Sequence, residues 1–176
     1  FLGHEGPFHA GWKARAAAHD GGLKSIDWEV IMNNAFLNKL IATDAGWGAL
    51  ALRIPVGIIF AAHGAQKLFG WFGGYGLEGT GQWMDSIGLS PGYLMALLAG
   101  GAEFFGGLAL IIGLLVRPAS AVLAFAMLIA IFSVHIGNGL FMSNNGYEFG
   151  LALLAGTVAV LIEGAGRFSL DRLIAR

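Results

Sequence analysis

Four long apolar segments limit what this chain can fold into. They run over about residues 48–69, 92–115, 118–138 and 147–165. Each approaches the roughly 20 residues that an α-helix needs to cross a bilayer. Only 12% of the residues are charged, about half the share of a soluble domain. The sequence therefore predicts an all-α integral membrane protein, an antiparallel four-helix bundle in a membrane domain of residues 48–173.

The part of the chain before this domain has a different character. Residues 1–31 are polar, with no sustained apolar periodicity, and we interpret them as an N-terminal extension or tag. Residues 32–47 are amphipathic, which predicts an interfacial amphipathic helix lying on the membrane surface. The apolar side chains expected on its buried face are Phe36, Leu37, Leu40 and Ile41.

The distribution of Lys and Arg predicts the orientation. Eight of them flank the segments on one side of the membrane and one, Lys67, lies on the other. Positive residues mark the cytoplasmic side, so both termini are expected there (N-in/C-in). The eight are Lys13, Arg15, Lys24, Lys39, Arg117, Arg167, Arg172 and Arg176.

Composition also excludes several functions. A net charge of −1 gives no electrostatic basis for binding nucleic acid. The chain has no Cys, which excludes disulfides, iron–sulfur clusters and covalently attached c-type haem. The N-terminal His4, His9 and His19 have no helical ligand spacing, so no metal site is predicted.

The first apolar segment contains three ionisable residues, Arg53, His63 and Lys67. At 100° per residue they share one helical face of about 80°. A charge at bilayer depth costs roughly 2.5–3.5 kcal/mol on insertion scales. This face should therefore point toward protein or a cavity, and Gly57 and Gly64 beside it should allow close helix packing.

The other segments supply polar residues at comparable depth, and together they predict a ligand-binding site in the outer half of the membrane. Its members are His63, Lys67, Glu103, His135 and Glu148. His63 and Glu103 are the best candidates for catalysis, because both can exchange protons. Near the inner face, Arg53 is expected to form a structural ion pair with Glu163, Glu103 being the other carboxylate considered.

Each of these residues also has a structural interpretation. Lys67 can extend to the outer headgroups, and Glu148 at a helix start can favour the helix dipole. His135, near a helix end, can be solvated. The functional interpretation depends on their convergence at one depth.

The assembled pattern resembles the DoxX family of small bacterial four-helix membrane proteins over about residues 46–173. The most specific part is His-Gly-x-x-Lys-Leu-Phe-Gly at residues 63–70, followed by Glu103. The weaker parts are Arg53-x-x-x-Gly57, His135, Asn145-x-x-Glu148 and Gly-Arg-Phe-Ser-Leu-Asp at residues 166–171.

The resemblance implies a multi-pass protein of the bacterial inner membrane with a link to redox chemistry. Relatives are associated with a quinol oxidase, with a thiosulfate:quinone oxidoreductase and with an oxidative-stress complex. We therefore expect either a subunit that binds quinone or quinol or a non-catalytic scaffold for redox partner subunits. A small-molecule or lipid carrier, acting as a homo-oligomer, is the third alternative. Haem b between His63 and His135 is disfavoured, because His135 is one turn shallower.

Overall fold

The structure is a computed structural model that describes residues 35–175. The extension predicted for residues 1–31 and the start of the predicted amphipathic helix, residues 32–34, lie outside this range. Within the described part every regular element is helical and none is a strand. The all-α prediction is confirmed.

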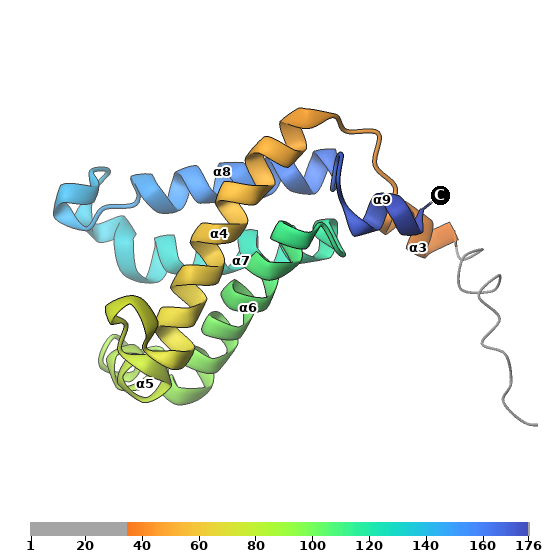
Figure 1. Cartoon of the computed structure of the whole chain (residues 1–176). Helices are drawn as coiled ribbons and strands as arrows, with labels where there is room; N and C mark the ends of the chain where they lie inside the picture. The colour runs from red at the N-terminus through yellow and green to blue at the C-terminus, as the bar shows by residue number, and fades with distance from the viewer. Residues whose placement is uncertain (1–34, 176) are drawn as a thin grey trace, which may run out of the picture. The chain divides into compact units, whose positions relative to one another are not determined.

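Seven α-helices form the described part of the chain (Figure 1). They are α3 (Ala35–Ile41), α4 (Trp47–Phe69), α5 (Gly76–Ser86), α6 (Gly92–Ile112), α7 (Val116–Ala130), α8 (Glu148–Glu163) and α9 (Leu170–Ile174).

Three helical stretches are long and apolar enough to cross a membrane. They are α4, α6 and the continuous run Val116–Asn138, in which α7 extends through a π-helical turn and a 3-10 turn. The fourth predicted span corresponds to α8, which has 16 residues. At 1.5 Å per residue it covers about 24 Å, less than the roughly 30 Å hydrocarbon core, so its crossing stays a prediction.

Left-handed glycines end two of the long helices. Gly70 ends α4 at φ 73°, and Gly113 ends α6 at φ 72° and donates its N–H to the carbonyl of Ala109. Glycine adopts this conformation without the strain that a Cβ would add. The α6–α7 connection therefore spans residues 113–115, whereas the predicted spans end at residue 115 and begin again at residue 118. Pro118 lies in the first turn of α7, where proline is tolerated.

Glycines bring α4 and α6 into close contact, and the two helices lie side by side in Figure 1. A Cβ added at Gly64 would overlap the backbone of Phe104, and one at Gly57 would lie 2.8 Å from the carbonyl oxygen of Gly107. Close approach through small residues is how membrane helices gain packing energy. The expectation that Gly57 and Gly64 face another helix is confirmed.

The core contains apolar side chains from all four long helices. Phe60 of α4, Leu110 of α6, Leu123 of α7 and Val160 of α8 are almost completely buried together. Many other large apolar side chains point outward, and Phe125 is 64% exposed. An apolar exterior of this kind suits contact with lipid.

The connection between the first two predicted spans contains a helix, α5, which has 11 residues and packs against α4 and α6. The expected helix over 32–47 ends at Ile41. The hydroxyl of Thr43 in the following link bonds the carbonyl of Glu163 and the N–H of Gly166, which fixes a non-helical path toward α4.

Candidate functional site

Arg53 is completely buried and binds backbone rather than a carboxylate. Its guanidinium donates five hydrogen bonds to carbonyl oxygens at distances of 2.5 to 3.3 Å. The expected ion pair with Glu163 is not formed among the described residues, and Glu163 is exposed. The five acceptors belong to Leu110, Ile111, Ala165, Arg167 and Phe168.

These carbonyls are available because two helices end nearby. The last C=O groups of a helix have no partner within it, and α6 ends at Ile112 while residues 164–169 turn away from α8. A planar guanidinium with five donors fits such a cluster. Arg53 therefore joins α4, α6 and the C-terminal segment at one end of the bundle, called here the Arg53 end.

Asp171 completes this end. Its carboxylate accepts the N–H groups of Leu115 and Val116 at 2.7 and 2.9 Å, so it caps the start of α7. Burial raises the pKa of Asp171 above its ordinary value, while the two N–H donors and the charge of Arg53 act in the opposite direction. Trp47 also contacts the segment, with its ring centroid 5.4 Å from that of Phe168.

At the opposite end, Lys67 and Glu103 form an ion pair between α4 and α6. The Lys67 Nζ lies 2.5 Å from the Glu103 Oε2. The Glu103 side chain is 6% exposed and that of Lys67 is 24% exposed. Removing two charges from water is unfavourable, and their mutual attraction offsets this only when the geometry of the pair is good. Two residues of the predicted site are thus brought into direct contact, and this region is called here the Lys67 end.

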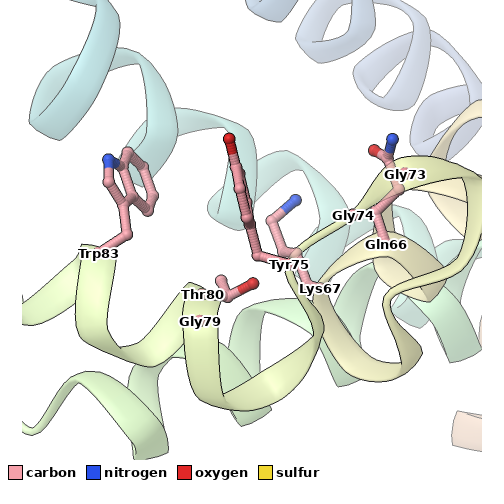
Figure 2. A pocket seen from close by; sticks show the side chains of 8 residues that line it. All are labelled: Gln66, Lys67, Gly73, Gly74, Tyr75, Gly79, Thr80 and Trp83. Atoms are coloured by element: carbon pink, nitrogen blue, oxygen red, sulfur yellow. The ribbon is translucent and has the colours of Figure 1, made fainter.

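An open pocket of about 530 Å³ lies beside this ion pair. Figure 2 shows the side chains of Lys67, Tyr75 and Trp83 projecting to the same side, the last two from the α5 region. Its volume is within the range of about 300–1,000 Å³ that small-molecule sites have. The lining residues are Gln66, Lys67, Gly73, Gly74, Tyr75, Gly79, Thr80 and Trp83.

His63 lies one turn from Lys67 on α4 but outside the pocket lining. Its side chain is exposed, and its ring centroid is 6.1 Å from that of Phe149 on α8. It is close enough to Lys67 and Glu103 to interact with their charges. His63 therefore adjoins the ion pair electrostatically without lining the pocket.

His135 and Glu148 hold the loop between them. The Nδ1 of His135 lies 2.8 Å from the carbonyl oxygen of Asn145. The carboxylate of Glu148 accepts the N–H of Met142 at 2.6 Å. These hydrogen bonds give both residues a role in shaping the 139–147 loop. Neither residue lines the pocket, and of the five predicted ligands only Lys67 does.

Several pocket residues were not identified from the sequence. Tyr75, Thr80 and Trp83 were not among the predicted ligands. The available signal was a Gly-rich run containing four aromatic residues between two spans, since glycine permits close approach and aromatics supply flat walls.

A second, smaller cavity of about 270 Å³ lies at the Arg53 end between the start of α4 and the end of α8. Its walls are mostly small or apolar, including Ala49, Leu52 and Val160, with the carboxylate of Glu163 among the lining residues. The two cavities share no lining residue.

A family model described as DoxX matches residues 48–136. CatD of Bacillus subtilis (strain 168), which is named as a candidate oxidoreductase, is 35% identical over 124 residues, 70% of this chain and 84% of CatD. The inner membrane protein YqjF of Escherichia coli (strain K12) is 33% identical over 133 residues, 72% of this chain and 92% of YqjF. No solved structure matches the chain.

The family match covers α4, α5, α6, α7 and the π-helical turn that follows. It therefore includes the ion pair and the whole pocket lining, and both relatives are covered over most of their length. The chain is an integral membrane protein and belongs to the DoxX family.

Proposed function

We propose that the protein is a redox-linked subunit of the bacterial inner membrane that binds the ring of a quinone or quinol in the pocket at the Lys67 end. The observation that carries the proposal is the position of Lys67. Its ammonium is held by a buried carboxylate and its side chain lines an open pocket with two aromatic residues. A polar group of this kind in a mostly apolar concavity is a common arrangement for a small-molecule site.

The side chains suit a flat ring with two carbonyl groups. Tyr75 and Trp83 offer faces for stacking, and Lys67 and Thr80 offer hydrogen-bond donors for the carbonyl oxygens. Reduction of a quinone to a quinol consumes two electrons and two protons. In this proposal a redox partner subunit supplies the electrons, and Glu103 relays protons through Lys67 to the carbonyl oxygens.

The relatives and the charge distribution support the location. YqjF is named as an inner membrane protein and CatD as a candidate oxidoreductase. Among the described residues, Lys39, Arg117, Arg167 and Arg172 lie at the Arg53 end, against Lys67 at the other end. This excess favours a cytoplasmic position for both termini. The pocket would then lie toward the outer face. Haem b is not part of the proposal, because neither His63 nor His135 lines the pocket.

The test is ligand-dependent thermal stabilisation of the purified protein by short-chain benzoquinone and naphthoquinone analogues. Tyr75→Ala should weaken binding at least about tenfold, equivalent to about 1.4 kcal/mol, without loss of folding because Tyr75 is 84% exposed. Thr80→Val should weaken it by removing one donor with little change of shape. Glu163→Gln, at the other end of the bundle, is the control and should bind normally.

Absence of stabilisation of the wild-type protein by every analogue would refute the proposal. The second candidate, a non-catalytic scaffold for redox partners, would then be favoured. The bonding of Arg53, His135 and Glu148 supports that alternative, because all three hold backbone in place. A scaffold should retain its partners in pull-down experiments when Tyr75 or Thr80 is replaced. The carrier alternative gains no support from two cavities without a shared lining residue.

A further inference from the structure

The rim of the pocket at the Lys67 end, defined here as residues 71–83, is rich in exposed aromatic side chains, of which Tyr75 and Trp83 line the pocket itself. Trp71 is 55% exposed, Phe72 74%, Tyr75 84% and Trp83 43%. Exposed Trp and Tyr side chains are typical of the bilayer interface, where one part of the ring is apolar and the other is wet. These four residues thus indicate that the rim lies in lipid headgroups rather than in bulk water.

The charges of the connecting segment agree with this position. Residues 70–91 contain only two ionisable carboxylates, Glu78 and Asp85. The Asp85 carboxylate accepts hydrogen bonds from the Ser90 hydroxyl at 2.7 Å and from the Gly92 N–H at 2.8 Å. A loop facing water alone would carry more charge and fewer exposed aromatics.

The pocket also lies at the depth where spans end. Gln66 and Lys67 belong to the last turn of α4, which ends at Phe69, and α6 begins at Gly92. The same end of both helices therefore borders the pocket. Hydrocarbon meets headgroups where a span of this length ends.

Close backbone contacts fasten α5 and its flanking turn over this end. A Cβ at Gly74 would overlap the backbone of Gln66, and a Cβ at Gly81 would lie 2.9 Å from the Cα of Tyr93. These approaches fix the rim to both spans. Because α5 is held in place, the route left for a ligand is the open side of the pocket, past Tyr75 and Trp83.

From these observations we infer that the pocket takes its ligand directly from the bilayer interface, and that the ligand is a ring carrying a hydrocarbon tail that remains in the lipid when the ring is bound. This inference rests on the proposed function and adds the substrate class and the direction of uptake. The ring reaches Lys67 between the two aromatic side chains, and the tail need not leave the hydrocarbon.

The first measurement compares benzoquinones with a butyl and a decyl tail, binding to the protein in lipid nanodiscs. Dissociation constants are expressed as mole fraction of quinone in the lipid. A tail that stays in the bilayer leaves this constant nearly equal for the two compounds. A pocket that draws the tail out of the lipid would weaken binding of the decyl compound, relative to the butyl compound, about 4,000-fold, since each of the six additional CH₂ groups contributes about fourfold.

The second measurement uses a variant in which Trp83 is the only tryptophan, the others being replaced by Phe. Its fluorescence should be quenched by lipids brominated near the headgroup end of the acyl chain more strongly than by aqueous iodide. A matched variant retaining only Trp47, at the start of α4, gives the reference for an interfacial position at the Arg53 end.

The outcomes separate this inference from the proposed function. If the butyl quinone binds but the decyl compound binds far more weakly, or if iodide alone quenches Trp83, uptake from the bilayer is wrong while quinone binding stands. If no quinone of either tail length binds, both are wrong, whatever the quenching of Trp83. Equal mole-fraction constants together with acyl-chain quenching support both.

Discussion

The carboxylate of Glu103 is buried between α4 and α6 and is paired with the ammonium of Lys67 at 2.5 Å. The pair joins two helices that approach each other closely through glycine, and it borders the pocket. Its partners are unequally exposed, because Lys67 reaches the cavity whereas Glu103 does not. Replacing Lys67 should therefore destabilise the fold mainly by leaving the Glu103 carboxylate buried without a partner.

Lys67→Met is expected to lower the free energy of unfolding by about 2 kcal/mol, below the 3–5 kcal/mol typical of fully buried pairs because Lys67 is partly exposed. The double variant Lys67→Met/Glu103→Met should regain at least half of the lost free energy of unfolding, since no unpaired buried charge then remains at this site. Chemical unfolding in detergent micelles, followed by circular dichroism, gives both values. Additive losses in the double variant would show that the pair does not control stability.

Arg53→Lys should be severely destabilising although the charge is kept. A lysine has three donors without the planar geometry that reaches five carbonyl oxygens, and each buried carbonyl left without a partner costs about 1–3 kcal/mol. We expect a loss of at least about 3 kcal/mol, measured by the same unfolding method. Arg172→Lys is the control and should be nearly neutral, because no hydrogen bond from the Arg172 guanidinium is present in the described structure.

Gly64→Ala should disrupt the α4–α6 contact, because the new Cβ would overlap the backbone of Phe104. Overpacking of this kind costs about 1–3 kcal/mol. Gly101→Ala on α6 is the matched control, since a Cβ there has no neighbour within 4 Å and alanine favours the helix. Equal stability of the two variants would indicate that the helices can separate without cost.

Asp171 should make stability depend on pH. Burial raises the pKa of its carboxyl above the ordinary 3.8, so the folded protein binds this proton more tightly than the unfolded chain does. The contribution is complete below pH 3.8 and is lost as pH rises through the folded-state pKa. The free energy of unfolding should therefore fall more steeply as pH rises above about 3.8 in wild type than in Asp171→Asn. Parallel pH curves would exclude this role.

The sequence was sufficient to predict helix type and approximate position, because long apolar runs have few alternatives. Charge patterns also located Lys67 and Glu103 in one site, since both are ionisable residues within apolar segments. Arg53 was expected to form an ion pair with Glu163, and its observed partners could not be predicted. Those partners are backbone carbonyls at helix ends, and every residue type has one.

The remaining site residues show a second limit. Depth along a helix placed His135 and Glu148 near Lys67, yet the adjoining loop backbone forms hydrogen bonds with both. Tyr75 and Trp83 became pocket residues only through the orientation of α5, which depends on glycine contacts between distant segments. Neither effect leaves a periodic signal in the sequence.

The carbonyl acceptors of Arg53 set a lower bound on the length of chain that can fold as a unit. Two acceptors lie at residues 110 and 111, and the other three lie at residues 165, 167 and 168, beyond the end of α8. A fragment that ends with α8 would keep the hydrophobic segments, but the buried Arg53 guanidinium would lose three of its hydrogen-bond acceptors. Nested reporter fusions, a usual way of mapping membrane topology, would then report on misfolded fragments unless each retains residues up to Asp171.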